Sequence, residues 1–244
     1  MTSTRLIAAV VAGISLVALT AAFDRKSPTD RLVSRSQLLA LSVHGRPIKA
    51  LERGDPDAPR RELIVGCIHG NEQAGIAIAE AMETLSLPKE TALWVVENSN
   101  PDGAAAGTRT NGHGVDLNRN FPWRWRKFGV RGDPHYTGPT PLSEPESRAL
   151  AALIRRVRPT VAIWFHQPLG LVDESGGSVA VERRYASLVG LPLRRLPRYR
   201  GGVTDWQNQR FRPASAFVVE LPPGSLSGGR PFAYARAALR VLAD

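Results

Sequence analysis

The sequence is poor in cysteine: its 244 residues include one, Cys67. A single cysteine excludes a disulfide within the chain. Cys67 lies in the apolar run from Leu63 to Ile68, and no neighbouring residue would activate its thiol. We therefore expect a small buried side chain at this position rather than a nucleophile. The chain also lacks a low-complexity tract and an internal repeat, which is typical of an ordinary globular domain.

No nucleic-acid-binding motif is present, although the formal net charge is +10. Many of the basic residues come as isolated pairs, such as Arg60-Arg61, Arg155-Arg156 and Arg194-Arg195. A positive charge of this size favours anionic partners. Because the pairs are scattered, we expect no nucleic-acid partner and interpret them as solvated surface that biases the protein toward acidic substrates.

Charge is absent from residues 6 to 23, an apolar run that follows Arg5 and ends in small residues. This layout predicts an export signal over residues 1–22, cleaved after Ala21 or Ala22. An uncleaved signal anchor is the alternative, because a run of about 18 residues approaches the length that spans a bilayer. We therefore predict an exported protein (secreted, in the cell envelope or in the periplasm), with a membrane anchor only if this segment is retained.

Hydrophobic patterning organises the rest of the chain. Residues 23–45 are polar and without strong periodicity, so they are predicted to form a linker, with a short helix at most. Short apolar runs predict buried strands at 61–68, 92–96, 160–165 and 216–221. Helical periodicity marks 73–85, 143–156, 179–189 and 231–243, with Ser143 and Glu146 as an expected capping box. This alternation predicts a single α/β domain over residues 46–244, with a mixed, largely parallel central sheet flanked by helices.

Three chemically active residues stand at the ends of predicted strands. His69 follows the first strand, His166 ends the third, and Glu220 lies near the end of the fourth. Ligands of open α/β sheets bind outside the carboxyl ends of the strands, so these side chains are expected to converge. His69-x-x-Glu72 can reach one metal, and two imidazoles with one carboxylate leave a fourth position open, as in catalytic zinc sites. A lone strand-end histidine is more often structural, but a carboxylate in an apolar strand is costly without a partner.

Three further motifs follow in order along the chain. They are Asn100-Pro101-Asp102-Gly103, Thr108-Arg109-Thr110-Asn111 and Val115-Asp116-Leu117-Asn118-Arg119-Asn120-Phe121. Taken with His69-x-x-Glu72, His166 and Glu220, they resemble the M14 family of zinc carboxypeptidases. The resemblance covers residues 46 to 244, and the order of so many motifs makes it specific. It implies the zinc carboxypeptidase fold and one zinc ion.

The resemblance implies a role for each matching residue. His69, Glu72 and His166 would bind the zinc ion. Glu220 would take a proton from the attacking water and pass it to the leaving amine. His44, His113 and His135 fall in polar loop contexts, and we expect no metal role for them.

Other matching residues would handle charge on the substrate. Arg109 would stabilise the oxyanion of the tetrahedral intermediate. Asn118 and Arg119 would hold the terminal carboxylate of the substrate, a task that suits a guanidinium fork. Asp116 would accept a hydrogen bond from a zinc-bound histidine and orient its ring.

The sequence departs from the family near its expected substrate pocket. Family members carry a mobile tyrosine, for which Tyr199 is the candidate, although it stands closer to Gly201-Gly202 than the pattern requires. Tyr185 is an alternative. Thr204 would lie near the floor of the specificity pocket, where a threonine selects neither aromatic nor basic side chains clearly.

The short chain and the predicted export resemble the compact bacterial branch of the family, which cuts the γ-D-glutamyl–diaminopimelate bond of cell-wall peptides. We therefore predict a monomeric zinc peptidase acting on a peptidoglycan-derived peptide. A general secreted carboxypeptidase for L-peptides and a deacylase of the aspartoacylase and succinylglutamate desuccinylase type are alternatives. A non-catalytic wall-binding module is an alternative from another class.

Overall fold

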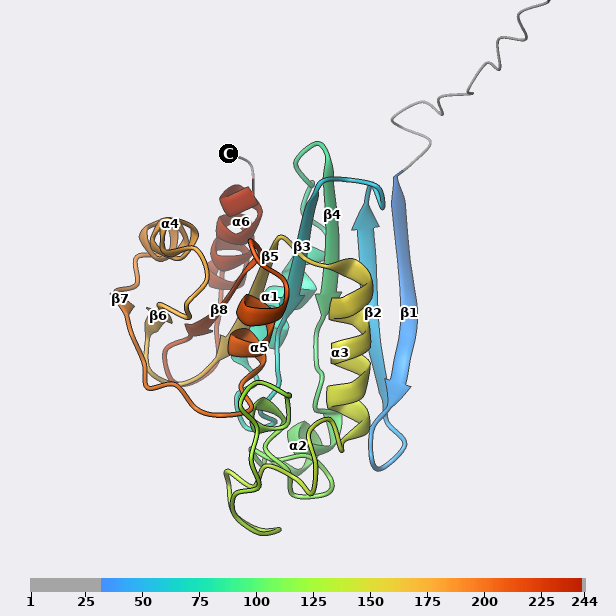
Figure 1. The fold of residues 1–244 in the computed structure, drawn as a ribbon. Coiled ribbons are helices and arrows are strands. Elements are labelled where there is room, and N and C mark those ends of the chain that lie inside the picture. Colours follow the sequence, from blue (N-terminus) through green and yellow to red (C-terminus); the bar gives the residue numbers. More distant parts are fainter. Residues whose placement is uncertain (1–31, 243–244) are drawn as a thin grey trace, which may run out of the picture.

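The computed structural model describes residues 32–242, so the predicted export signal lies outside the described residues. The strands in this part of the chain form one eight-stranded sheet in the order β1-β2-β4-β3-β5-β8-β6-β7 (Figure 1). Strand bounds are β1 (Val33–Leu41), β2 (Pro47–Gly54), β3 (Arg60–Val65), β4 (Thr91–Val96), β5 (Val161–His166), β6 (Leu171–Asp173), β7 (Leu193–Arg194) and β8 (Ser215–Glu220). Helix bounds are α1 (Ala74–Met82), α2 (Pro101–Ala106), the 3-10 helix η2 (Leu117–Arg119), α3 (Pro145–Val157), α4 (Val179–Val189), α5 (Val203–Arg210) and α6 (Arg230–Leu242).

The centre of the sheet is parallel, and an antiparallel pair joins it to each flank. Strands β4, β3, β5 and β8 pair in parallel, whereas β2 runs antiparallel to β4 and β6 runs antiparallel to β8. This arrangement confirms the predicted mixed α/β sheet. Because β3, β5 and β8 run in one direction, their carboxyl ends meet at one edge of the sheet, where the long segment 98–141 also lies.

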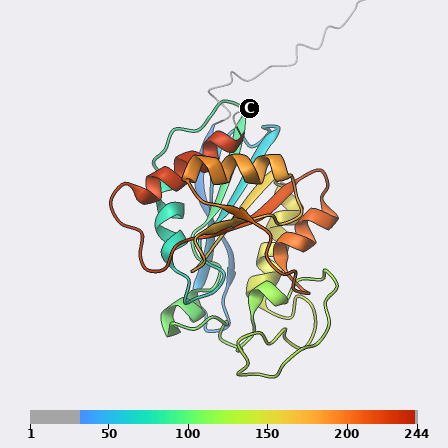
Figure 2. The same cartoon turned by 90° about the vertical axis from the view of Figure 1, so that its left-hand side faces the viewer.

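Two apolar layers cover the two faces of the sheet. Alternate residues of β5 point to opposite sides: Ile163 packs with α1, α4 and α6, whereas Trp164 packs with α3 and α5. Figure 2 shows these helices on either side of the strands. Both faces are buried, which explains why the central strands are continuous apolar runs in the sequence. Among the described residues no helix combines the length and the apolar character that crossing a membrane requires.

Strand β1 overturns the linker prediction. Residues Val33–Leu41 pair antiparallel with β2 along the outer edge of the sheet, inside the segment expected to be a linker. As an edge strand, β1 keeps most of its side chains half or fully exposed. It therefore needs no apolar alternation, and backbone hydrogen bonds, which leave no pattern in the sequence, hold it in place.

The expected capping box at the start of α3 is also wrong. The helix begins at Pro145, with Glu144 as its N-cap and no side-chain capping bond. The Glu146 carboxylate is buried and accepts hydrogen bonds from the Val43 backbone N–H (3.1 Å) and from the Asn111 side chain (2.9 Å). Donors from distant segments therefore replace the local capping partner.

Glu62 of β3 makes the folding stability of the protein depend on pH. Its side chain is fully buried, and neither carboxylate oxygen has a hydrogen-bond partner among the described residues. Burial raises the pKa of Glu62 from 4.5 to about 8. The carboxyl is therefore neutral in the folded protein at low pH, and folding stability falls as the pH rises from 4.5 to about 8.

We expect Glu62→Gln to remove this loss. At pH 5 the variant should match the wild type, and at pH 9 its free energy of unfolding should exceed that of the wild type by on the order of 3–5 kcal/mol. Urea denaturation at both pH values measures the difference, with the exposed Asp57→Asn as the control. If the free energy of unfolding depended on pH in the same way in Glu62→Gln and in the wild type, Glu62 would not be the source of the loss in stability.

Candidate active site

Three side chains meet at the carboxyl edge of the sheet. His69 and Glu72 lie in the turn between β3 and α1, and His166 is the last residue of β5. His69 Nδ1 lies 3.0 Å from Glu72 Oε2 and 3.1 Å from His166 Nδ1, and His166 Nδ1 lies 2.9 Å from Glu72 Oε2. These atoms form a compact triangle, and all three residues are more than nine-tenths buried.

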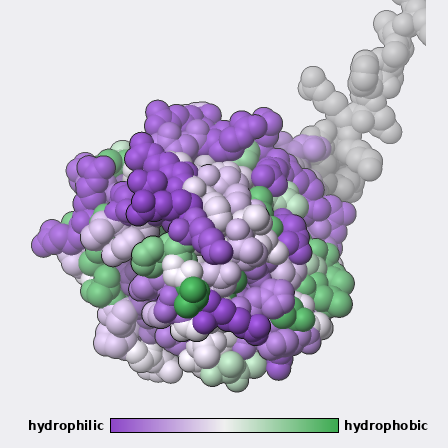
Figure 3. Space-filling model, turned by 60° about the horizontal axis from the view of Figure 1, so that its bottom comes forward, coloured by the Kyte–Doolittle hydropathy of each residue, from purple (hydrophilic) through white to green (hydrophobic). Residues whose placement is uncertain are grey.

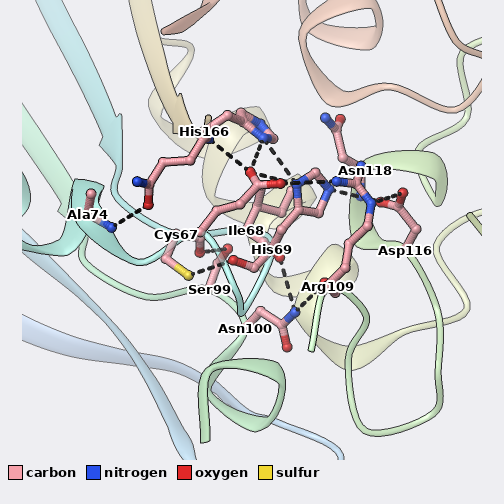
Figure 4. A network of polar contacts seen from close by, with 12 residues as sticks. Cys67, Ile68, His69, Ala74, Ser99, Asn100, Arg109, Asp116, Asn118 and His166 are labelled. Carbon is pink, nitrogen blue, oxygen red and sulfur yellow. Dashed lines mark hydrogen bonds and ion pairs between the residues drawn. The ribbon is translucent and has the colours of Figure 1, made fainter. Parts of the chain in front are cut away.

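The triangle fits a metal ion better than a set of hydrogen bonds. His69 Nε2 lies 3.1 Å from the buried Asp116 Oδ1, so this nitrogen donates its proton there and leaves a lone pair on Nδ1. That lone pair faces Glu72 Oε2, which can only accept. Figure 4 shows the His69 and His166 rings turned toward the same point. A cation at this point would turn three mutually repelling donor atoms into ligands, and two imidazoles with a carboxylate suit zinc.

Asp116 contacts the His69 ring at Nε2, the nitrogen that points away from Glu72 and His166. Its Oδ1 lies against His69 Nε2 and accepts the Asn118 backbone N–H at 2.9 Å. Its Oδ2 accepts Arg109 Nε at 3.0 Å. Burial raises the pKa of Asp116, but the interactions with His69, His135 and the Arg109 guanidinium outweigh it and hold this pKa well below its usual range. The carboxylate therefore stays charged and orients the His69 ring, as predicted from the sequence.

Arg109 joins two carboxylates of the site. Besides Asp116, its guanidinium donates from Nη1 to Glu72 Oε1 at 3.0 Å. Asn100 holds the backbone of Arg109 beside the backbone that precedes His69, since its Nδ2 donates to the carbonyls of Ile68 and Arg109. The side chain of Asn100 also caps α2 by accepting the Gly103 N–H at 3.0 Å. Through Asn100, the Asn-Pro-Asp-Gly motif therefore connects the segment that carries His69 and Glu72 to the segment that carries Arg109.

Asn118 and Arg119 come from η2 on the opposite wall. Asn118 Oδ1 accepts the Val203 N–H at 3.0 Å, which fastens η2 to the start of α5. Arg119 lies with its guanidinium carbon 4.4 Å from the centre of the Tyr199 ring. Gly201 has a φ of +76°, and a Cβ there would overlap the Arg119 carbonyl, so glycine is required for this approach.

Glu220, the last residue of β8, faces His166 in the parallel pairing of β5 and β8. Its Oε2 is buried and has no hydrogen-bond partner among the described residues. Burial raises the pKa of Glu220, and the nearby Glu72 charge raises it further against the opposing effect of His166. A carboxylate in this state has unused capacity to accept a proton.

One cleft of about 220 Å³ contains most of the residues that the sequence marked. Its walls include His69, Glu72, Arg109, Asn118, Arg119, His166, Tyr199, Thr204 and Glu220. Thr204, in the first turn of α5, is 4% exposed, whereas Tyr199 is 55% exposed at the rim. Tyr185 does not contribute: it is fully buried on α4 and its hydroxyl donates to the Tyr234 carbonyl. The alternative assignment of the mobile tyrosine to Tyr185 is therefore wrong.

The cleft also holds residues that sequence reasoning missed. Gln167 donates its backbone N–H to Glu72 Oε2, and its side chain bridges Ala74 to the Pro222 carbonyl. Asp173 of β6 pairs bidentately with Arg198 at 2.8 and 3.0 Å. Asp205 of α5 lines the cleft as well, and burial raises its pKa to about 6. Adjacency to His166 could have singled out Gln167, whereas no local signal connects Asp173 to Arg198.

Metal content tests the three-ligand set directly. We expect the purified protein to carry about one equivalent of zinc, because the three ligand atoms lie within 4.8 Å of one another. His166→Ala should reduce this to about a tenth or less, while the exposed His44→Gln should leave it unchanged. Metal analysis after gel filtration gives the answer, and full zinc retention in His166→Ala would contradict the site.

The fold and the site define a class: α/β proteins with a His/Glu/His metal set at the carboxyl edge of a mixed sheet. A family model described as zinc carboxypeptidase matches residues 26–172. The chain belongs to this family, whose cofactor is zinc, and the ligand set described above fits that ion.

Relatives and solved structures support the family assignment. Murein peptide amidase A of Vibrio campbellii is 36% identical over 196 residues, which cover 75% of this chain and 77% of the relative. The protein of that name from Escherichia coli K12 is 38% identical over 132 residues, and the match spans about half of its length (54%) and 49% of this chain.

The crystal structure of murein-tripeptide amidase MpaA from Escherichia coli O157 superimposes with a TM-score of 0.69 and 29% identity. It covers 84% of this chain and 91% of that one. Carboxypeptidase A from Helicoverpa armigera gives a TM-score of 0.73 at 18% identity, over 86% of this chain and 69% of that one, and so shows the shared fold alone.

Proposed function

We propose that this protein is a zinc metallopeptidase that hydrolyses an amide bond next to a free carboxylate in cell-wall peptides. The observation that carries the proposal is the common cleft, in which the metal set, Glu220 and Arg119 face one space of about 220 Å³. A metal set suits hydrolysis when a nearby carboxylate, here Glu220, keeps one oxygen without a hydrogen bond among the described residues, and a guanidinium on the opposite wall suits recognition of an anionic end group.

The residues of the cleft divide the reaction among them. Arg119 binds the free carboxylate of the substrate, and the Asn118 side-chain amide donates beside it. Glu220 takes the proton from the attacking water and delivers it to the leaving amine. Arg109, held in place by Glu72 and Asp116, stabilises the negative charge that develops on the carbonyl oxygen.

Zinc, held by His69, Glu72 and His166, would supply Lewis acidity, which polarises a carbonyl and makes water acidic enough to attack near neutral pH. The electrostatic surroundings of Glu72 favour binding of a cation. Burial alone would raise the pKa of Glu72, but His69 and His166 hold it well below its usual range. Glu72 therefore remains an anion that a divalent cation can use.

The cell-wall substrate is supported by the two murein peptide amidases to which this chain is similar. The face that carries segment 98–141 is also mainly hydrophilic, with hydrophobic residues in small separate patches (Figure 3). Such a surface suits a polar, carboxylate-rich peptide. Export, predicted from residues 1–22, would bring the enzyme to that substrate, and we propose a monomer because one chain supplies every residue to which we assign a role.

Paired substrates test the proposal. The enzyme is incubated with L-Ala-γ-D-Glu-diaminopimelate and, separately, with an ordinary L-peptide, and the products are identified by mass. We expect release of diaminopimelate from the first. Cleavage of the L-peptide alone would overturn the cell-wall assignment in favour of a general carboxypeptidase. If zinc is bound and neither peptide is cleaved, the peptidase proposal fails, and the deacylase and the non-catalytic wall-binding module remain as alternatives.

A further inference from the structure

A second cavity adjoins the catalytic cleft. It has a volume of about 310 Å³ and is lined by Arg119, Arg126, Phe128, His135, Thr137, Arg198, Tyr199 and Arg200. Three of these residues, Arg119, Arg198 and Tyr199, also line the catalytic cleft. The wall between the two spaces therefore contains the guanidinium that we assign to the substrate carboxylate, stacked on an exposed aromatic ring.

Two of the positive charges in this cavity have no compensating partner among the described residues. None of its lining residues is acidic. Arg198 already pairs with Asp173, but in the described part of the chain Arg126 and Arg200 have neither an ion-pair nor a hydrogen-bond partner. Like charges that share one small space repel each other unless an anion joins them. The two arginines come from separate segments and are brought together only by the fold.

The backbone around the cavity is held in place. The Phe121 N–H donates to the Gly201 carbonyl at 3.0 Å, and the Gly201 N–H donates to the Trp123 carbonyl at 2.9 Å. These two bonds fix the segment of Arg200 beside the segment of Arg126. On the other side, Phe128 and Thr137 exchange backbone and hydroxyl hydrogen bonds of 2.9 to 3.3 Å. The backbone that carries the two exposed arginine side chains is therefore ordered.

We propose that this cavity is a second anion subsite, in which Arg126 and Arg200 bind a carboxylate on the side chain of the substrate's terminal residue. The inference rests on the proposed function, because it assumes that Arg119 holds the terminal carboxylate. A group attached to that residue and extending past Arg119 and Tyr199 enters the second cavity. The site then selects substrates whose last residue carries two carboxylates.

Matched substrates and variants test the subsite. One peptide ends in 2-aminopimelate, which has a carboxylate at the end of its side chain, and its partner carries the corresponding side-chain amide. Wild-type enzyme should cleave the dicarboxylate with a kcat/KM about tenfold or more above that of the amide, as expected for a charge-assisted hydrogen bond. The double variant Arg126→Gln/Arg200→Gln should reduce this ratio to about one, with the amide cleaved as before.

The control has the same change in charge at two exposed positions on α4 and α6, Arg183→Gln/Arg236→Gln, and should keep the wild-type ratio. A wild-type ratio near one, or a ratio that survives in the Arg126/Arg200 variant, overturns the subsite while leaving the peptidase assignment intact. Calorimetric binding of free 2-aminopimelate against its side-chain amide decides the question independently of turnover. If neither peptide is cleaved, the proposed function fails, and this affinity difference still supports or refutes the subsite.

Discussion

Glu220→Gln should abolish turnover while leaving zinc and substrate bound. Glutamine has the shape of glutamate but cannot accept the proton of the attacking water, so we expect kcat to fall by about 10³-fold or more. The fold should tolerate the change, because Oε2 of Glu220 makes no hydrogen bond within the described residues. Zinc content near one equivalent and an unchanged affinity for the substrate would separate this loss from loss of the metal.

Steady-state rates on the tripeptide, metal analysis and calorimetric binding are measured on the same preparation. Glu174→Gln is the matched control, because its carboxylate lies outside the cleft and 4.0 Å from Arg195. It should retain wild-type kcat. Hydrolysis by Glu220→Gln at the wild-type rate would show that another group accepts the proton, and the mechanism proposed for this site would be wrong.

Arg119→Gln should reduce kcat/KM by about 10²-fold or more on a substrate with a free terminal carboxylate. The guanidinium stacks on the Tyr199 ring, and burial lowers its pKa. A carboxylate that enters this space exchanges water for a direct fork-like contact. Losing that contact should raise KM and also lower kcat, because the same contact positions the amide bond.

A substrate with an amidated terminus is the informative comparison. Wild type should cleave it slowly, and Arg119→Gln should make it little slower, so the preference for a free carboxylate should disappear. Arg119→Lys should recover part of the rate, since it keeps the charge but loses the planar fork. Arg131→Gln, an exposed arginine of the same long segment, controls for net charge. An undiminished preference for the free carboxylate in Arg119→Gln would remove Arg119 from this role.

These predictions concern residues that the sequence alone could single out, because the relevant signals are local. Apolar runs that end in His166 or Glu220 mark buried strands with polar ends, and parallel strands present such ends at one edge. The short spacing of His69 and Glu72 limits how far apart their side chains can lie. The sheet, the helices around it and the convergence of the metal set could therefore be predicted, and the family resemblance supplied their roles.

Other features depend on contacts between segments that carry no shared pattern. Strand β1 is held by edge hydrogen bonds, so the segment looks like a linker in the sequence. Glu146 was expected to cap its helix, but in the fold it meets donors from Val43 and Asn111. The pairing of Asp173 with Arg198 is likewise decided by packing, because the residues lie on different elements and neither has a distinctive neighbourhood.

The sequence by itself singled out the candidate metal ligands, the carboxylate proposed for catalysis and the class of sheet that carries them. Only the tertiary structure decided what surrounds them: the stacking of Arg119 on Tyr199, the shape of the cleft, and the unpaired charges of Arg126 and Arg200 beside it. The physical reason is that periodicity and motif spacing report on a residue's own strand or helix. A cavity wall is built from side chains of several segments, whose meeting follows from the packing of the whole chain.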